Sequence, residues 1–378
     1  MTAFMPETGR RYRLGFTLIE ILVAVAILAI IMVLASQMIG ATGKIWKNTT
    51  AKLESFQGAR DAFQLMADQL RQSTVNTYWD YFNAAGQSRA QYNATSPTTP
   101  FIPACYARQS ELHFISGPGL IPNQITHAVF FQAPLGFASN KTTYGALQNL
   151  LSASGFFIEF GDGTNVVNSA PSFLPGTQPQ YRYRLMQFIQ PTEQLAVYNY
   201  SLTSATAPNI WFTNPISTAH GSTVRVIATN VIGLILAPKQ TDSATDTLAP
   251  SYAFDSRLGL NSGVAVPGTT WKPGVNSQPL QMNQMPPVIR LALIVLDEPS
   301  AKVLQGSGTT APAKITAAFA QNNLNTDSKP LFTTAANLDS DLLYLQNGPA
   351  GLSKITPHVN FRVFNTTTIV RSARFSTK

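Results

Sequence analysis

The sequence predicts an α+β protein in which a long N-terminal α-helix packs on a mainly antiparallel β-sheet domain with long loops. Residues 16–39 are almost all apolar, and apolar side chains then recur every three or four residues to about residue 75, which is the pattern of one long helix. Beyond residue 79, short runs of β-branched and aromatic residues are bounded by Pro, Gly and Asn. Because no strand–helix alternation follows, we expect the strands to pair in antiparallel fashion.

The composition excludes several classes of site. Of the 378 residues, 44% are apolar and only 12% are charged, and the net charge is +8. The basic residues are spread thinly, without the run of Lys and Arg that marks a nucleic-acid surface, so we expect no nucleic-acid partner. Cys105 is the only cysteine, which excludes an intrachain disulfide and a zinc site built from cysteines.

The segment from Phe16 to Ile39 is long enough to cross a membrane. Its 24 residues carry Glu20 as the only charge. As a helix with ~1.5 Å rise per residue they extend about 36 Å, against ~30 Å for the hydrocarbon core of a bilayer. A secretory signal normally has a shorter apolar region, although residues 33–35 could form a signal-peptidase site. A plain single-span anchor explains the length but leaves the acid without a partner.

A third interpretation accounts for the acid. Residues 15–20, GFTLIE, follow three arginines and open the apolar helix, and this combination resembles the processing signature of type IV prepilins and type II secretion pseudopilins. The resemblance implies that residues 1–15 are a cytoplasmic leader, that prepilin peptidase cleaves after Gly15, and that the new amino group on Phe16 is methylated. It also implies that Glu20 pairs with the Phe16 amine of a neighbouring subunit and sets axial register. The alternative, that Glu20 only reaches the cytoplasmic headgroups, stays open.

The helix is expected to continue as an amphipathic segment over residues 40–75. One stripe contains Leu53, Phe56, Arg60, Phe63, Ala67, Leu70 and Thr74. We expect this stripe to pack on the protein's own sheet rather than to form a coiled coil with a partner only. Gly40 and Gly43 are candidates for a bend or a local melt just beyond the membrane.

Residues 76–378 are expected to form a β-rich domain in the periplasm. Strands are predicted over residues 112–116, 127–133, 156–160, 181–189, 224–228, 231–236, 288–296 and 359–364. Residues 240–287 are rich in Pro, Gly, Ser, Thr, Asn and Gln, and we interpret them as a surface excursion or a partly disordered insert.

A subgroup is indicated by three stretches. Residues 59–81 resemble the post-membrane helix of the large minor pseudopilins of the component J type and of PilW-like minor pilins. Together with residues 181–191 and 286–304, they resemble the prepilin-like Verru_Chthon cassette protein C group. One departure is that the C-terminal disulfide of many major pilins is impossible here, which argues against a major fibre-forming subunit.

Other chemistry has weak support in the sequence. No nucleophile-elbow, P-loop, zinc-protease or paired-cysteine motif occurs, so we expect no enzyme and no cofactor. The four histidines are interpreted as structural or surface residues. Asp162 and Asn165 could supply oxygen ligands to calcium, as could Asp339 and Asp341, but each pair also suits a turn or a helix cap. The alternation of Tyr and Arg over residues 181–184 could bind single-stranded DNA, whereas a strand with exposed Arg and buried Tyr explains it more simply.

The sequence therefore predicts a structural protein, a minor pilin or pseudopilin that starts, caps or modifies a type IV pilus or a type II secretion pseudopilus. It would be processed by prepilin peptidase, span the inner membrane once through residues 16–39, contact its lipids, and assemble with other pilins of the same fibre. The alternative is a membrane-anchored periplasmic binding or adhesion module that does not enter a fibre.

Overall fold

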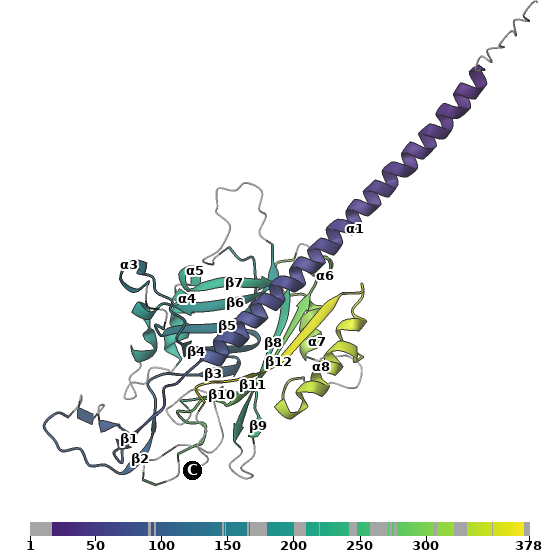
Figure 1. The fold of residues 1–378 in the computed structure, drawn as a ribbon. Helices are drawn as coiled ribbons and strands as arrows, with labels where there is room; N and C mark the ends of the chain where they lie inside the picture. Colours follow the sequence, from purple (N-terminus) through teal and green to yellow (C-terminus); the bar gives the residue numbers. More distant parts are fainter. Residues whose placement is uncertain are drawn as a thin grey trace, which may run out of the picture. The chain divides into compact units, whose positions relative to one another are not determined.

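The computed structural model describes residues 17–89, 92–93, 96–145, 147, 149–164, 166, 180–199, 209–218, 220–241, 248–257, 271, 274–275, 278–305, 308–320, 331–349 and 351–373. The chain divides into two units, Met1–Ala51 and Lys52–Lys378, and each is described by itself. Helix α1, Leu18–Gln72, contributes residues to both (Figure 1).

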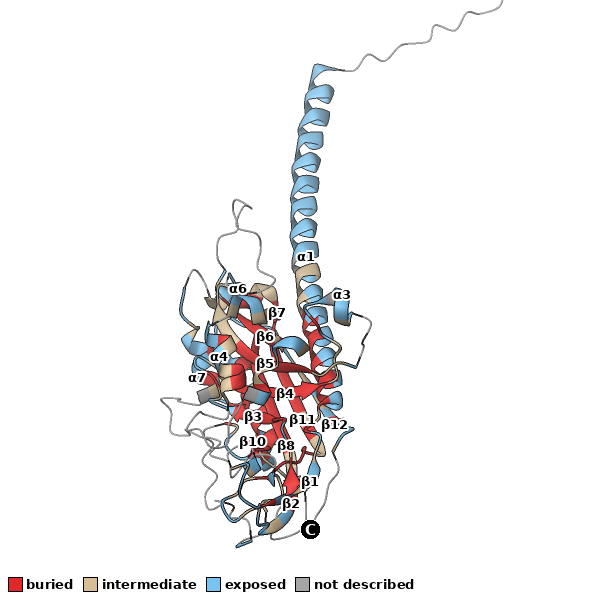
Figure 2. Ribbon diagram, turned by 90° about the vertical axis from the view of Figure 1, so that its left-hand side faces the viewer, coloured by how far each residue is buried: buried red, intermediate tan, exposed pale blue. Residues whose placement is uncertain are grey.

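The described part of the first unit is the beginning of α1. From Leu18 to Lys47 every residue is exposed, including a long series of Ile, Leu, Val and Met side chains (Figure 2). Gly40 and Gly43 were expected to bend or melt the helix, but α1 continues through both, so the prediction of a melt is wrong. A glycine costs about 1 kcal/mol relative to alanine in a helix, and that penalty does not interrupt a long helix whose hydrogen bonding is cooperative.

In the second unit, the remainder of α1 lies across the strands of its sheets (Figure 1). One stripe of its side chains is buried. The buried residues follow the three–four spacing of an amphipathic helix and are Phe56, Ala59, Ala62, Phe63, Met66, Ala67, Gln69 and Leu70. Leu53 and Arg60, which the sequence analysis placed in the stripe, are exposed. The ring of Phe63 packs 6.1 Å from that of Phe364, so the prediction that this helix packs on the protein's own sheet is confirmed.

The strands that the structure describes form three antiparallel sheets. Six strands pair in the order β10 (Phe254–Asp255), β3 (Ile115–Pro118), β4 (Ile125–Ala133), β5 (Ser152–Gly161), β6 (Arg182–Gln190) and β7 (Val224–Thr229). Four pair in the order β12 (Phe361–Ile369), β11 (Val288–Leu296), β8 (Val231–Thr241) and β9 (Leu248–Pro250). A separate ribbon pairs β1 (Tyr78–Phe82) with β2 (Cys105–Gln109). The predicted α+β class with antiparallel sheets is confirmed.

The two larger sheets meet where the chain passes from β7 to β8. Asn230 forms this corner with a positive φ of 61°, and its backbone N–H donates to the carbonyl of Tyr183 at 2.7 Å. Asparagine tolerates the left-handed region better than most residues because its short side chain can hydrogen-bond locally. Its side-chain amide donates to Glu298 Oε2 at 2.7 Å, which ties the corner to helix α6 (Glu298–Gln305).

Aromatic side chains fill the core of the six-stranded sheet. Phe130 stacks on Phe212 of helix α4 (Ile210–Thr218), with ring centroids 4.0 Å apart and an interplanar angle of 13°. Phe130 also covers Gly155 on the neighbouring strand so closely that a Cβ there would lie 2.2 Å from its Cδ1 atom. Gly155 is therefore needed for the fit between β4 and β5.

A polar cluster is buried between α1 and this sheet. Ser154 Oγ and Gln187 Nε2 both donate to Gln69 Oε1, at 2.8 and 3.0 Å. Arg225 donates through Nε and Nη2 to Gln187 Oε1, at 2.9 and 2.7 Å. Since these groups satisfy one another, the cluster fixes the position of α1 along the sheet without leaving a buried donor unpaired.

The prediction that residues 240–287 form a surface insert is wrong for the parts of this segment that the structure describes. Strand β9 pairs with β8, and β10 pairs with β3. Tyr252, Phe254, Asp255, Met282 and Met285 are all buried. These buried residues could not be recognised in a polar, turn-rich sequence, because burial at single positions produces no periodic pattern.

Short helices that the sequence analysis did not predict complete the second unit. They are α3 (Lys141–Tyr144), α5 (His220–Thr223), α7 (Ala313–Ala320), α8 (Leu338–Asn347) and the 3₁₀ turns Thr192–Gln194, Ala196–Asn199, Ala335–Asn337 and Leu352–Lys354. Asp339 and Asp341 lie in the first turn of α8, where a negative charge favours the helix N-terminus. Asp339 pairs with Arg290, and Asp341 Oδ2 accepts the backbone N–H of Phe332 at 3.0 Å.

Candidate functional site

The cleavage and methylation positions predicted from the sequence, Gly15 and Phe16, lie outside the described residues. The structure begins immediately after them, with Thr17 preceding the first residue of α1. The predicted assembly residue, Glu20, lies in the first turn of that helix. The geometry of Thr17 and Glu20 is therefore the part of this site that the structure shows.

Thr17 and Glu20 hydrogen-bond each other across the first turn. The backbone N–H and the hydroxyl of Thr17 both donate to Glu20 Oε2, at 2.8 and 2.9 Å. In return, the backbone N–H of Glu20 lies 3.4 Å from Thr17 Oγ1. This is a capping box, in which the residue before the helix and the third residue of the helix satisfy each other's free groups.

The capping box gives Glu20 a role that the sequence analysis missed, although Thr17 and Glu20 have the spacing that predicts it. One carboxylate oxygen, Oε2, is engaged within the chain, while Oε1 has no hydrogen bond or ion pair with any described residue. A carboxylate near a helix N-terminus is also favoured by the helix dipole. Glu20 is thus held at the start of α1 with one oxygen still available.

Helix α1 is the one described helix that is long and apolar enough to cross a membrane. Its exposed apolar stretch is followed by Lys44, Trp46 and Lys47, and the Trp46 side chain is itself exposed. Tryptophan is enriched at the boundary between hydrocarbon and water, where its ring is apolar and its N–H can be hydrated. These residues are suited to mark one end of a membrane span.

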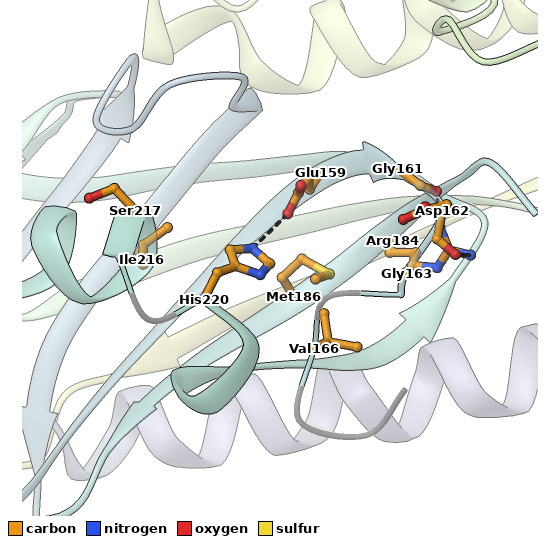
Figure 3. Close-up of a pocket in the computed structure, with 10 residues that line it drawn as sticks. All are labelled: Glu159, Gly161, Asp162, Gly163, Val166, Arg184, Met186, Ile216, Ser217 and His220. Carbon is orange, nitrogen blue, oxygen red and sulfur yellow. Dashed lines mark hydrogen bonds and ion pairs between the residues drawn. The ribbon is translucent and has the colours of Figure 1, made fainter. Parts of the chain in front are cut away.

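A second candidate site is a polar pocket of about 260 Å³ in the second unit (Figure 3). Asp162, the weak metal candidate, lies at one end of the pocket beside Arg184. Asp162 Oδ1 accepts the backbone N–H of Thr164 at 3.1 Å, and Gly163 has a φ of 71°, so the segment forms a tight turn. Asn165, the other candidate ligand, lies outside the described residues.

The guanidinium of Arg184 occupies the side of the turn where a cation would need oxygen ligands. It donates to the carbonyls of Gly161, Asp162 and Gln180, with Nη2 at 3.0 Å from Asp162 and 2.6 Å from Gln180. A positive charge in this position opposes cation binding. Across the part of the chain that the structure describes, no group of three or more His, Cys, Asp or Glu side chains could hold a metal ion.

The arginines of β6 are buried, which corrects the expectation that they would face solvent. Arg182 and Arg184 are 7% and 8% exposed, and Tyr183 between them is 5% exposed. Arg182 reaches Glu298 and the side chain of Gln305, while the carbonyls of the 161–162 turn satisfy Arg184. Burial lowers the pKa of Arg184, and the neighbouring charge of Arg182 acts in the same direction. Neither guanidinium is presented to a nucleic acid.

Near the middle of the pocket, His220 Nε2 lies 3.1 Å from Glu159 Oε2 (Figure 3). Ser217 also lines the pocket, but its hydroxyl donates to the carbonyl of Asn214 at 3.0 Å and points away from His220. A nucleophilic serine must be within hydrogen-bond reach of its base. Ser217, His220 and Glu159 therefore do not form such a group in this conformation.

The two histidines that are buried among the described residues, His113 and His127, have separate partners. His113 Nε2 lies 2.8 Å from Asp255 Oδ1, and its Nδ1 accepts the indole N–H of Trp211 at 3.0 Å. His127 Nδ1 lies 3.1 Å from the backbone nitrogen and 3.2 Å from the backbone oxygen of Leu236. The network of His113 joins the segment before β3 to β10 and α4, so its evident role is structural.

Comparison with known proteins locates one match, at the N-terminus. Residues 10–36 match the model of the prokaryotic N-terminal methylation motif. No curated protein and no solved structure matches the chain. The chain thus carries a prepilin-type methylation motif that ends within the apolar part of α1, and this motif implies processing by prepilin peptidase and assembly with other pilins.

Proposed function

We propose that this protein is a minor pilin or pseudopilin that starts, caps or modifies a type IV pilus or a type II secretion pseudopilus. Prepilin peptidase would cleave between Gly15 and Phe16 and methylate the new amino group. The observation that carries the proposal is the methylation motif over residues 10–36, placed where an exposed apolar helix begins. In that arrangement the apolar surface of the helix is available first to lipid and then to other helices of the same kind.

The position of the chain in the membrane follows from the same helix. Residues 16–39 would cross the inner membrane, with Trp46 near its periplasmic boundary and the second unit in the periplasm. The arginines before the motif favour a cytoplasmic N-terminus.

A minor role is supported by the size of the second unit. Residues 52–378 carry two large sheets and several added helices, and the buried stripe of α1 in this unit is already covered by its own strands. A bulky subunit of this kind fits a tip or a sparse position better than every position of a tightly packed helical fibre. The role of an initiator, a cap or a modifier is therefore the finer part of the proposal.

Glu20 would act in both the free and the assembled protein. In the free chain its Oε2 caps α1 through Thr17. During assembly, Oε1 would receive the Phe16 amine of a neighbouring subunit, which would neutralise two charges at the membrane boundary. This arrangement lets the carboxylate be satisfied before and after assembly without a change in the helix.

One surface favours the alternative of a membrane-anchored binding module. On the β1–β2 ribbon, the exposed rings of Trp79, Tyr106 and Tyr81 pack in a row, with centroids 5.4 and 5.0 Å apart. Exposed aromatic clusters are common at protein interfaces. This surface would also serve a minor pilin at a fibre tip, so assembly must be tested directly.

The test compares Glu20→Gln with Thr17→Val by crosslinking to neighbouring subunits in membranes. Glu20→Gln retains an acceptor for the capping box but removes the charge, whereas Thr17→Val removes the hydroxyl and keeps the charge. Both variants should be inserted and cleaved after Gly15. We expect crosslinking to be lost in Glu20→Gln and retained in Thr17→Val. Equal crosslinking of Glu20→Gln and wild type would show that the carboxylate has no role in assembly.

A further inference from the structure

A mainly apolar cavity of about 400 Å³ lies in the second unit, where β4 and β8 meet α7. Its apolar lining includes Ile125, Ile235, Ile315, Phe319, Leu331 and Phe332. Helix α7 is closely packed on β8, because a Cβ at Gly233 would lie 2.6 Å from Phe319 Cζ. The volume is within the range of about 300–1,000 Å³ that is usual for small-molecule sites.

Two residues of the cavity wall have a backbone conformation that is rare for their type. Thr126 has a φ of 63° and Phe332 a φ of 57°. Positive φ is a genuine outlier for β-branched and bulky residues, and such outliers cluster at ligand-binding and other functional sites. Both residues line the same cavity.

Dedicated polar groups hold each of these residues in place. Gln124 Nε2 donates to the carbonyl of Thr126 at 2.9 Å, and Thr126 Oγ1 accepts the backbone N–H of Leu234 at 3.0 Å. For Phe332, the buried carboxylate of Asp341 accepts its backbone N–H at 3.0 Å. The wall is therefore shaped by specific hydrogen bonds and does not depend on apolar packing alone.

His127 supplies a polar ring nitrogen at the cavity. Its Nδ1 lies 3.1 Å from the backbone nitrogen and 3.2 Å from the backbone oxygen of Leu236, so Nδ1 is engaged with the backbone in either neutral tautomer and Nε2 is the other polar atom of the ring. Nε2 has no hydrogen-bond partner among the described residues, although the side chain is 3% exposed. Burial lowers the pKa of His127 to about 4, which keeps the ring neutral near pH 7.

The described lining of the cavity offers no group that could neutralise a charged ligand. Among the lining residues that the structure describes, none is Asp, Glu, Lys or Arg. Its remaining polar side chains include Tyr183 and Thr316, which hydrogen-bond each other. A charged molecule would lose its hydration without gaining a counter-ion, whereas an uncharged apolar molecule would only exchange water for apolar contacts.

We propose that this cavity binds a small, uncharged, largely apolar molecule that has one hydroxyl group, which can donate or accept, placed against Nε2 of His127. The apolar part of the ligand lies against α7 and Phe332. This site is separate from the methylation motif and does not depend on assembly into a fibre.

The test uses the full chain in lipid nanodiscs and two photoreactive probes with the same alkyl chain and diazirine, a dodecanol and a dodecanoate. Labelled residues are identified by tandem mass spectrometry. Labelling of residues 18–47 of α1 measures each probe in the lipid phase and serves as the internal reference. Relative to that reference, we expect the alcohol to label residues 315–319 and 331–332 about tenfold or more above the carboxylate.

Two matched variants locate the probe. Thr316 is exposed and lines the cavity, whereas the neighbouring Ala317 is exposed and does not. Thr316→Trp should remove the label from the cavity, and Ala317→Trp, which adds the same side chain to the same helix, should keep it. Thermal unfolding of both variants checks that the fold is retained.

The comparison of the two probes on wild type needs no variant, so it stands even if Thr316→Trp does not fold. Labelling of the cavity at the level of other exposed residues, or equal labelling by alcohol and carboxylate, would overturn the proposal. Unchanged labelling in a folded Thr316→Trp variant would also overturn it.

Discussion

Replacing Gln69 by leucine tests the polar cluster that positions α1 on the sheet. In the folded protein Gln69 is 9% exposed, and its Oε1 accepts hydrogen bonds from Ser154 Oγ at 2.8 Å and Gln187 Nε2 at 3.0 Å. Leucine has a similar volume but no acceptor, so two buried donors lose a partner. Each such loss costs about 1–3 kcal/mol.

Two effects reduce the total cost. Gln187 Nε2 also lies 3.3 Å from Ser154 Oγ, which can partly replace the lost acceptor. The leucine side chain gains about 1–2 kcal/mol from burial relative to an amide. We therefore expect Gln69→Leu to lower the free energy of unfolding by about 2 kcal/mol.

The assay is denaturant unfolding of the full chain in detergent, followed by tryptophan fluorescence. Gln64→Leu is the matched control, because Gln64 lies on the exposed face of the same helix and its replacement should change stability by less than ~0.5 kcal/mol. Adding Ser154→Ala to Gln69→Leu should recover little of the loss, because it removes one unpaired donor but also the remaining acceptor for Gln187 Nε2. Gln69→Leu that is as stable as wild type would refute the assigned role of the cluster.

Three further predictions concern the second unit. Gly155→Ala should lower the free energy of unfolding by about 1–3 kcal/mol or more, because the new Cβ would clash with Phe130. Gly161→Ala on the same strand has room for a Cβ and is the control, and denaturant unfolding of both variants gives the comparison. Burial lowers the pKa of His127 from 6.5 to about 4. Between these two pH values the unfolded chain binds a proton that the folded chain does not, so the free energy of unfolding should fall as the pH decreases from 6.5 to about 4, by up to about 3 kcal/mol. The same titration of His127→Gln should lack that component, and identical pH profiles would contradict the assignment. Finally, quantitative proteomics of purified fibres should find this chain in a small minority, and finding it as the most abundant subunit would refute a minor role.

The sequence predicted those elements whose signal is local and continuous. The strand predicted over residues 288–296 matches β11, and the helix predicted to about residue 75 ends at Gln72. A long apolar run or a sustained three–four spacing determines such elements almost without regard to the rest of the chain. The buried stripe was predicted less accurately. Leu53 fits the spacing but lies before the part of α1 that the strands cover, and Arg60 fits it but lies on the exposed face of the helix.

Features that depend on distant partners could not be predicted in this way. Arg184 is buried because the carbonyls of the 161–162 turn accept its hydrogen bonds, and Asp255 is buried because it lies beside His113. A polar residue in a strand indicates solvent unless such partners are known. At the candidate site, the methylation motif is a local pattern that the sequence alone predicts. The capping box of Thr17 and Glu20 is also a local pattern, but it was not predicted.

The central claim is most directly tested by the mature N-terminus of the protein, determined by mass spectrometry on material from its native membrane. Processing at the motif predicts a chain that begins with N-methylated Phe16, while Gly15→Trp should remain at full length because the cleavage site must admit a small residue. A wild-type chain that retains Met1, or one that begins at Ser36, would contradict the account.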